Sequence, residues 1–475
     1  MPRSSDRRGR SHRPPGGPGT RRSTGPVDPA RLAAYEVMKA VRVEDAYANL
    51  VLPHVLGRLG LEGRDAAFAT ELASGTLRQQ GTYDAILAAC VDRPLTKVEA
   101  KVLDALRLGA HQLLSMRVPD HAAISTTVGL VRSKAGPGAA GFANAVLRRV
   151  AGRSLETWVA ELAPARDADH DGWAAIAHSH PRWIVERLAA AVGSDDVDAL
   201  LAADNLPPRV TLVARPGRAR REELSGEPTA FSPYGVVLAS GSPGAVPAVA
   251  EGRAGVQDEG SQLVAIALAE APGGSAKECW LDLCAGPGGK SALLAALASE
   301  RGGVLVANER QPHRAGLVRD NLTDRRTRAL VGGAAGVVAA DGVRPPFRPG
   351  SVDRILVDAP CTGLGALRRR PEARWRREPA DLDALVPLQR ALLNAALDLV
   401  RPGGVVLYAT CSPVLEETRG VVESVLAEHD EVSLEPLGGT LGAIAGGDGP
   451  LPGTIQLWPH RHGTDAMFLA LLRRS

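Results

Sequence analysis

From about Asp28 to Gly152 the apolar positions repeat every three to four residues, which is the period of an amphipathic helix. Val98, Val102 and Leu106 show this spacing, and the same period occurs in several other stretches of the region. Polar residues occupy the positions between them. The pattern therefore predicts an all-helical domain of five to seven helices over residues 28 to 152.

The pattern changes after this region. Between residues 153 and 255, helical stretches give way to an alternating strand ending at Ala214 and then to a segment rich in Gly, Pro and Ser. Beyond it, strands alternate with helices, beginning with a strand at 280–283 and a helix at 290–298. Such alternation predicts a doubly wound parallel sheet with right-handed crossovers. The expected fold class is α/β, with a small α/β connector before an α/β domain over residues 256 to 475.

Composition is that of a folded protein, but the cores must be built with few aromatic side chains. Of the 475 residues, 44% are hydrophobic, 23% are charged and 3% are aromatic. The net charge of +3 is too small to indicate a polyanionic partner. Residues 1 to 27 carry seven arginines against Asp6, which predicts a disordered basic arm. No apolar segment is long enough to cross a bilayer and no signal peptide is recognisable, so a cytoplasmic location is expected.

The five cysteines are widely spaced and include no Cys-x-x-Cys pair, which disfavours a disulfide framework and a zinc site. We expect free thiols and no metal. Cys361 follows a predicted strand in the sequence Asp358-Ala-Pro-Cys, and Cys411 follows another in Ala-Thr-Cys-Ser. Because open α/β sheets carry their chemistry at the carboxyl ends of their strands, Asp358, Cys361 and Cys411 are candidate catalytic residues.

A glycine-rich loop joins the first strand of the α/β domain to its helix, in Leu281-Asp-Leu-Cys-Ala-Gly-Pro-Gly-Gly-Lys-Ser291. Glycines let the backbone approach a ligand, and the helix N-terminus supplies free N–H groups. The spacing fits neither the dinucleotide fingerprint nor the Walker motif, which indicates a nucleotide-like ligand without a pyrophosphate. Glu309, after the second strand, is placed for ribose hydroxyls, and Asp341, after the third, for adenine.

These motifs resemble those of S-adenosyl-L-methionine-dependent methyltransferases. They are most similar to the RNA 5-methylcytosine methyltransferases of the RsmB, Sun or Fmu family, which act on 16S ribosomal RNA. The resemblance rests on Asp-Leu-Cys-Ala-x-Pro-Gly-Gly-Lys, on Asp-Ala-Pro-Cys followed by Arg-Arg-x-Pro-Glu-x-x-Trp, and on Ala-Thr-Cys-Ser. The helical region, with Phe142-Ala-Asn-Ala-Val-Leu-Arg-Arg149, resembles the RNA-binding NusB fold. The family usually has Ala where Gly286 stands and Asp where Glu309 stands.

The resemblance implies S-adenosyl-L-methionine as cofactor and a thiolate that adds to carbon 6 of cytosine, so that carbon 5 can accept a methyl group. Mechanism alone leaves open which thiol attacks. The resemblance assigns Cys411 as nucleophile and Cys361 to product release, with Asp358 near the N3 edge of the base. The residues implied to contact the cofactor are Cys284, Ala285, Gly286, Pro287, Gly288, Gly289, Lys290, Glu309, Asp341 and Asp358.

An arginine-rich stretch follows Cys361, with six arginines to one glutamate over residues 367 to 377. Such density beside a catalytic loop is typical of phosphate contacts, and a tryptophan suits stacking on a base. The expected RNA-binding residues are Arg368, Arg369, Arg370, Arg374, Trp375, Arg376 and Arg377.

The sequence thus predicts a monomeric enzyme that methylates carbon 5 of a cytosine in 16S ribosomal RNA, in a loop or in unassembled RNA. Residues 28 to 152 would bind RNA and residues 256 to 475 would carry the methyltransferase. Two alternatives are a transfer RNA cytosine-5 methyltransferase and a non-catalytic NusB-like RNA-binding regulator. A regulator has no use for both thiols and the glycine-rich loop, which favours the enzyme.

Overall fold

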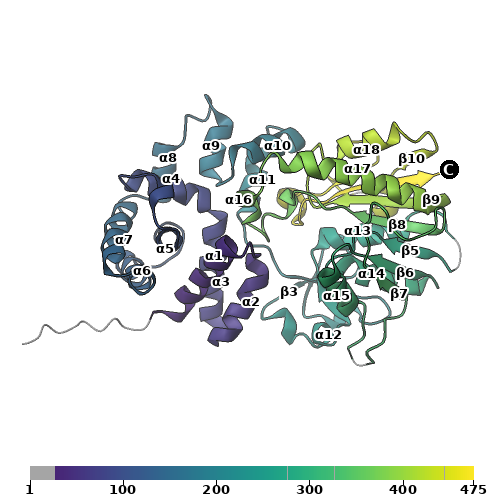
Figure 1. The fold of residues 1–475 in the computed structure, drawn as a ribbon, viewed down its shortest axis with the longest axis horizontal. Helices are drawn as coiled ribbons and strands as arrows, with labels where there is room; N and C mark the ends of the chain where they lie inside the picture. Colours follow the sequence, from purple (N-terminus) through teal and green to yellow (C-terminus); the bar gives the residue numbers. More distant parts are fainter. Residues whose placement is uncertain (1–26, 275–276, 326, 443) are drawn as a thin grey trace, which may run out of the picture.

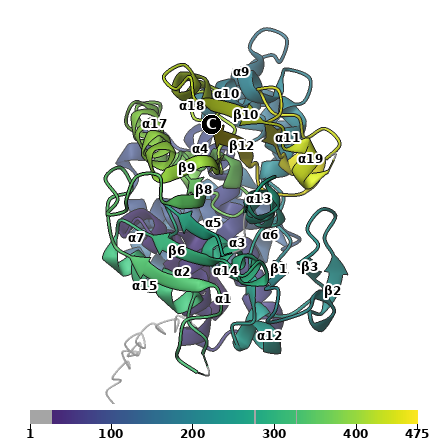
Figure 2. The same ribbon diagram turned by 90° about the vertical axis from the view of Figure 1, so that its right-hand side faces the viewer.

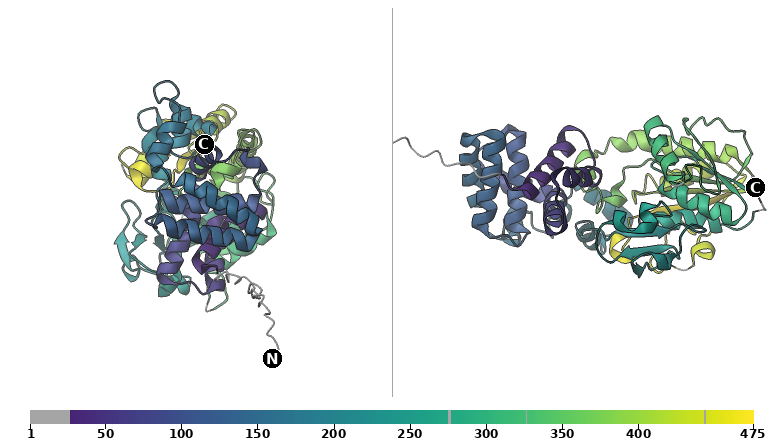
Figure 3. Two further views of the ribbon diagram at one scale, coloured as in Figure 1. Left: turned by 90° about the vertical axis from the view of Figure 1, so that its left-hand side faces the viewer. Right: turned by 90° about the horizontal axis from the view of Figure 1, so that it is seen from below.

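The structure, a computed structural model, describes residues 27 to 274, 277 to 325, 327 to 442 and 444 to 475. The predicted basic arm, residues 1 to 27, lies outside the described residues except for its last position. Two lobes lie side by side along the longest axis, one helical and one built around a large sheet (Figures 1 and 3). Within the described ranges, no helix combines the length and apolarity needed to span a bilayer.

The first lobe is entirely helical, as the sequence predicted. Its helices turn their apolar stripes toward one shared core, where Leu72, Leu87 and Leu106 are fully buried. The first helix begins after Asp28, whose side chain accepts a hydrogen bond from the Arg31 N–H. The elements are α1 (Pro29–Val43), α2 (Ala48–Leu59), α3 (Gly63–Arg78), α4 (Gln80–Cys90), η1 (Leu95–Lys97), α5 (Ala100–Leu114), α6 (Asp120–Ala135) and α7 (Pro137–Val150).

The connector has two parts. Four short helices come first, and three of them share a core with the stretch after Cys361, where Ile184 and Leu200 are buried together with Leu364 and Leu367. A small antiparallel sheet of order β2-β3-β1-β4 follows, beside the main sheet (Figure 2). The elements are α8 (Leu155–Leu162), α9 (His170–Ala177), α10 (Arg182–Val192), α11 (Val197–Asp204), β1 (Thr211–Ala214), η2 (Arg221–Glu223), β2 (Gly226–Pro228), β3 (Gly235–Leu238), η3 (Pro243–Ala245), α12 (Pro247–Ala250) and β4 (Ala254–Val256).

The second lobe confirms the α/β prediction. Its main sheet has the order β10-β12-β9-β8-β5-β6-β7, with β11 pairing β12. The strands from β9 to β7 are parallel, whereas β12 runs antiparallel to β9 and β10, so the sheet is mixed at one edge. The elements are α13 (Glu259–Glu270), β5 (Cys279–Asp282), α14 (Gly289–Glu300), β6 (Val304–Asn308), α15 (Pro312–Asn321), β7 (Ala334–Val338), β8 (Val352–Asp358), η4 (Leu364–Ala366), α16 (Ala373–Arg376), α17 (Asp381–Leu399), β9 (Val400–Thr410), α18 (Arg419–Leu426), β10 (Val432–Glu435), α19 (Gly438–Leu441), β11 (Ile455–Gln456), α20 (Pro459–His462) and β12 (Phe468–Arg474).

Helices cover both faces of this sheet. Leu356 and Leu407 face the core shared with α13 and α14, while their neighbours Ile355 and Tyr408 face the core shared with α17 and α18. The chain leaves β5 toward β6 and β7, then crosses to β8 on the other side of β5. The order of strands therefore reverses between β5 and β8, which is where open α/β sheets form their ligand crevice.

Candidate active site and cofactor loop

Two thiols meet beyond the carboxyl ends of β8 and β9. These strands are parallel neighbours, with Asp358 level with Ala409, so the loops that follow them begin side by side. The sulfur atoms of Cys361 and Cys411 are 3.4 Å apart, within hydrogen-bonding distance. Cys361 is buried at 9% exposure, whereas Cys411 is half-buried. The structure thus brings together the two cysteines expected at these strand ends.

A charged pair stands beside the thiols. Lys290, at the start of α14, donates from Nζ to Asp358 Oδ2 at 2.9 Å and to Ser261 Oγ at 3.3 Å. Burial alone would lower the pKa of Lys290, but the charge of Asp358 and its hydrogen bond raise that pKa. Lys290 is therefore a permanent cation that links the glycine-rich loop to the end of β8.

The surroundings of the two thiols differ, and this separates their acidities. The hydrogen bond from the Cys361 thiol lowers the pKa of Cys411 against burial and Asp358, and Lys290 and Arg370 act in the same direction. The hydrogen bond to Cys411, burial and the charge of Glu417 raise the pKa of Cys361 well above its usual range. Cys411 is thus the thiol that ionises more readily, and the thiolate is the nucleophilic form.

The glycine-rich loop turns sharply into α14. Gly288 adopts φ +108° as the N-cap of this helix, a backbone conformation that favours glycine. Asp282, at the end of β5, accepts a hydrogen bond from Ser291 Oγ at 2.6 Å, which fixes the strand to the helix. Burial raises the pKa of Asp282 to about 7, and its Oδ1 has no partner within the described chain.

Gly286 and Glu309 are in direct contact, although they come from different loops. The Gly286 N–H donates to Glu309 Oε2 at 3.0 Å, and the Gln311 N–H donates to Oε1 at 2.9 Å. Arg314 donates to the Gly286 carbonyl at 2.7 Å. A Cβ atom at position 286 would lie only 2.0 Å from Glu309 Oε2. Positions 286 and 309, where the sequence differs from the motif that it resembles, therefore share one contact.

The remaining predicted cofactor positions differ in accessibility. Asp341 is exposed, and its Oδ1 accepts from the Val343 N–H at 3.1 Å, which closes a turn at the rim of the crevice. Cys284 is partly buried within the loop, and burial together with the nearby carboxylates raises its thiol pKa well above the usual range. A reactive role for Cys284 is therefore disfavoured.

The loop and its surroundings fit a polar ligand that carries a positive charge. Two buried acceptors, Asp282 Oδ1 and Asn308 Oδ1, have no hydrogen-bond partner among the described residues. A Cβ atom added at Gly289 would meet nothing within 4 Å, so the first turn of α14 is open to a ligand. The carboxylates of Asp341 and Glu309 add negative charge that suits a cationic ligand, and they offer acceptors at the positions expected for the adenine and ribose of S-adenosylmethionine.

The arginine-rich stretch is where the structure departs most from the sequence prediction. Arg374 on α16 is fully buried, and its guanidinium donates to the carbonyls of Arg78 and Ser179 and to Asn205 Oδ1, at 2.8 to 3.1 Å. Trp375 donates from Nε1 to the Leu77 carbonyl at 2.9 Å. The expected phosphate contact is wrong for Arg374, because no part of its side chain reaches solvent. Residues 374 and 375 instead join the two lobes, where Figure 1 shows α16 between them.

The other residues of this stretch also bind within the chain. Arg368 and Arg369 pair with Asp465, and Arg369 also pairs with Asp258. Arg377 donates from Nε to the Thr362 carbonyl at 3.0 Å.

Two of the arginines, Arg370 and Arg376, lie over the ring of Tyr47, just before α2. Arg376 pairs with Asp45 at 2.9 Å and lies over the Tyr47 ring. Arg370 lies over the same ring, 4.9 Å from its centre, but is exposed. Of the predicted RNA contacts, Arg370 is the one that combines exposure with a position close enough to act on Cys411 electrostatically.

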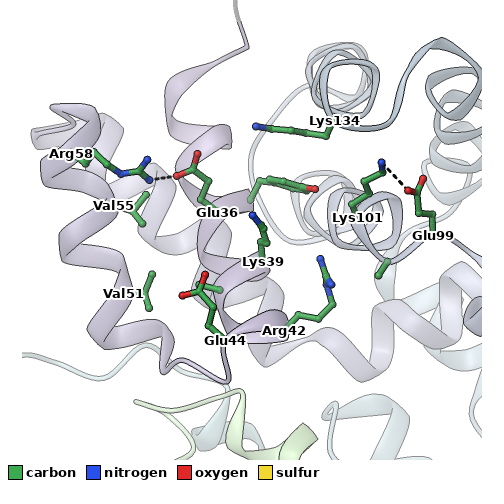
Figure 4. Close-up of a pocket in the computed structure, with 13 residues that line it drawn as sticks. Glu36, Lys39, Arg42, Glu44, Val51, Val55, Arg58, Glu99, Lys101 and Lys134 are labelled. Atoms are coloured by element: carbon green, nitrogen blue, oxygen red, sulfur yellow. Dashed lines mark hydrogen bonds and ion pairs between the residues drawn. The ribbon is translucent and has the colours of Figure 1, made fainter. Parts of the chain in front are cut away.

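A separate hollow of about 740 Å³ lies in the helical lobe between α1, α2 and α5 (Figure 4). Its acidic side chains are largely paired, since Glu36 binds Arg58 and Glu99 binds Lys101. Lys134 lies 5.7 Å from the centre of the Tyr35 ring at its edge. The hollow contains none of the predicted catalytic residues.

Sequence reasoning missed the residues that support the thiols. Glu417 and Gln389 are both fully buried and both bind the Cys361 loop. Neither lies in a recognisable motif, and the groups they bind are 28 to 55 residues away in the chain.

Comparison with known proteins gives matches to both lobes of the chain. Residues 268–473 match the family described as 16S rRNA methyltransferase RsmB/F, and residues 28–152 match the NusB family. A Mycobacterium tuberculosis protein named as a methyltransferase, Rv1407, is 52% identical over 94% of this chain and 97% of its own length. Ribosomal RNA small subunit methyltransferase B of Pseudomonas syringae pv. tomato is 34% identical over 93% of this chain and 96% of its own.

Solved structures show the same fold. The crystal structure of the protein PH0851 superposes with a TM-score of 0.76, covering 94% of this chain and 99% of that one, at 23% identity. The family inferred from the motifs is therefore confirmed by sequence matches that span nearly the whole chain. The chain belongs to the 16S rRNA methyltransferase RsmB/F family and carries a NusB-family helical domain.

Proposed function

We propose that this protein transfers a methyl group from S-adenosyl-L-methionine to carbon 5 of a cytosine in 16S ribosomal RNA. The observation that carries the proposal is the pair of thiols 3.4 Å apart beside Lys290 and Asp358. In the same proposal, residues 28 to 152 bind RNA, residues 153 to 255 connect the lobes, and residues 256 to 475 form the methyltransferase domain.

The chemistry begins with Cys411. Its thiolate forms a bond to carbon 6 of the base, and the electrons of the C5–C6 double bond move into the ring toward N3. Asp358 is proposed to face the N3 edge. In its protonated form it would donate a hydrogen bond to the negative charge that develops on N3, and as a carboxylate held by Lys290 it would orient the base instead. Carbon 5 then carries the electron density that a methyl group requires.

S-adenosyl-L-methionine, when bound, supplies an electrophilic methyl group. We propose that the residues of the glycine-rich loop, Cys284 to Lys290, hold it together with Glu309, Asp341 and Asp358. The proposal is supported by the order of the strands. Because β5, β8 and β9 are parallel neighbours, the loop after β5 lies at the same edge of the sheet as the loops that carry the thiols. Methyl transfer leaves carbon 5 with both a methyl group and a proton.

Release regenerates the enzyme. A water molecule accepts the proton on carbon 5, the C5–C6 double bond re-forms, and the bond between carbon 6 and Cys411 breaks with its electrons returning to sulfur. Cys361 is placed to assist, because its thiol can donate a hydrogen bond to the departing Cys411 sulfur. Arg370, exposed beside the pair, is proposed to contact an RNA phosphate.

The test is methyl transfer from labelled S-adenosyl-L-methionine to protein-free 16S ribosomal RNA, with transfer RNA in a parallel reaction. Cys411→Ala is expected to abolish transfer, and Cys361→Ala to trap a covalent protein–RNA adduct that survives denaturing electrophoresis. Cys279→Ala is the matched control, because this thiol lies at the start of β5, away from the crevice. Full activity in Cys411→Ala, or transfer to transfer RNA alone, would overturn the proposal.

A further inference from the structure

Glu417 is a fully buried carboxylate that accepts hydrogen bonds from the Cys361 loop and from Gln389. The Thr362 N–H donates to Oε1 at 2.8 Å, and the Thr362 hydroxyl donates to Oε2 at 2.5 Å. Gln389, also fully buried on α17, donates from Nε2 to Oε1 at 3.0 Å. Across the part of the chain that the structure describes, no cation pairs with Glu417. Its charge is balanced by neutral donors alone.

These contacts hold the chain on both sides of Cys361. Gln389 Nε2 also donates to the Pro360 carbonyl at 2.9 Å, so Pro360 is fixed before the cysteine and Thr362 after it. The Thr362 hydroxyl lies 3.0 Å from Ser412 Oγ, next to Cys411. Glu417 follows Cys411 by six residues, and its own carbonyl accepts from the Tyr408 hydroxyl at 2.7 Å. The carboxylate therefore ties the Cys361 loop to the turn that carries Cys411.

A carboxylate is an unfavourable group for a purely structural contact, because burying a charge without a counter-ion carries a large desolvation penalty. An amide of the same shape would accept and donate similar hydrogen bonds. The negative charge does distinguish the thiols. It lies on the Cys361 side of the pair, where it disfavours the Cys361 thiolate, while Lys290 and Arg370 favour the thiolate of Cys411.

We propose that Glu417 is a positioning residue that holds Cys361 against Cys411 for product release. Bond formation by Cys411 continues without Glu417, because the cations Lys290 and Arg370 still act on the Cys411 sulfur. The inference rests on the proposed function, because it assumes that Cys411 attacks the base and that Cys361 assists its departure. Glu417 touches neither the cysteine sulfurs nor, by its burial, the RNA. It acts through Pro360 and Thr362.

The experiment compares Glu417→Ala with wild type on protein-free 16S ribosomal RNA and S-adenosyl-L-methionine. Steady-state turnover is expected to fall on the order of 100-fold, as for loss of an acid–base group. Single-turnover methyl transfer should stay within about threefold of wild type, and a covalent adduct should accumulate as in Cys361→Ala. Glu416→Ala is the matched control, because its neighbouring carboxylate is 41% exposed and pairs with Arg187.

Glu417→Gln gives a second measurement that needs no substrate and that applies even if Glu417→Ala fails to fold. The amide keeps the shape but removes the charge that disfavours the Cys361 thiolate, so the Cys361 thiol should react faster with iodoacetamide at pH 8 than in wild type. Mass spectrometry of tryptic peptides reads this at each cysteine. An unchanged Cys361 rate would contradict the effect of the Glu417 charge on this thiol.

The outcomes also separate this inference from the proposed function. Suppose that Cys361→Ala still traps its adduct. The role of Glu417 would then be overturned if folded Glu417→Ala lost both methyl transfer and the adduct, or if its turnover equalled that of wild type. Failure of Cys361→Ala itself to trap an adduct would instead overturn the assignment of the two thiols.

Discussion

An alanine at position 286 should disrupt the contact between Gly286 and Glu309. In Gly286→Ala, the new Cβ would lie 2.0 Å from Glu309 Oε2 and 2.8 Å from Arg314 Nη2. The carboxylate would have to retreat by more than about 1 Å to reach an ordinary contact distance. It would then lose the hydrogen bond from the Gly286 N–H, which measures 3.0 Å in the wild type.

A hydrogen bond to a charged group contributes about 1.5 to 3 kcal/mol, so Gly286→Ala should destabilise the chain by about 2 kcal/mol. Glu309→Asp alone should cost a similar amount, because the shorter side chain no longer reaches the Gly286 N–H. In the double variant, the aspartate leaves room for the alanine. The double variant should therefore be destabilised by about 1 to 2 kcal/mol less than the sum of the two single variants.

The assay is thermal unfolding of the full chain, combined with hydrogen exchange of the loop from 281 to 291 to assign the transition. About 2 kcal/mol corresponds to a fall in Tm of roughly 4 to 8 °C for a domain of this size. The control is Gly316→Ala in α15, where an added Cβ meets nothing within 4 Å and helix propensity favours alanine. Costs for Gly286→Ala and Glu309→Asp that add to within about 0.5 kcal/mol would refute the reasoning.

Two further predictions concern the junction of the lobes. Arg374→Met should destabilise the chain by about 3 to 5 kcal/mol, because several buried acceptors lose their donor, and it should speed proteolysis between the lobes. The control is Arg209→Ala, which should leave stability and proteolysis unchanged because the Arg209 side chain is 69% exposed. Equal protease resistance in both variants would contradict this. Burial raises the pKa of Asp204 to about 7, so the folded chain binds a proton there that the unfolded chain releases above about pH 4. The stability of the chain should therefore fall as pH rises from about 4 to 7, and the Tm of Asp204→Asn should rise relative to that of wild type across this range. A Tm difference that stays constant at all pH values would contradict this prediction.

The position of the candidate catalytic residues at strand ends could be predicted from sequence, because it depends on local order alone. Asp358, Cys361 and Cys411 each follow a short apolar run, and parallel neighbouring strands end at the same edge of a sheet. The position of the glycine-rich loop between the first strand and its helix could likewise be predicted from the spacing of its residues. Neither inference needed to know how distant parts of the chain fold against one another.

The errors share the opposite property. A run of arginines on the surface and one buried against carbonyls look alike in sequence, and the carbonyls that bind Arg374 belong to residues 78 and 179. Glu417 could not be singled out for the same reason, since its partner Thr362 is 55 residues away. The antiparallel strand β12 was missed because strand direction depends on the return path of the chain rather than on the strand itself.

The junction of the lobes and the catalytic loop converge on one residue. Thr362 is bound at its N–H by Glu417 and at its carbonyl by Arg377, which directly follows α16. The preceding residues of that stretch, Arg374 and Trp375, are anchored to carbonyls of the helical lobe. Without the helical lobe, the other lobe would lose the acceptors that hold α16. It would then lose the restraint that Arg377 places on Thr362, the residue next to Cys361. The helical lobe therefore contributes to the geometry of the thiol pair as well as to any contact with RNA, and catalysis must be tested on the complete chain.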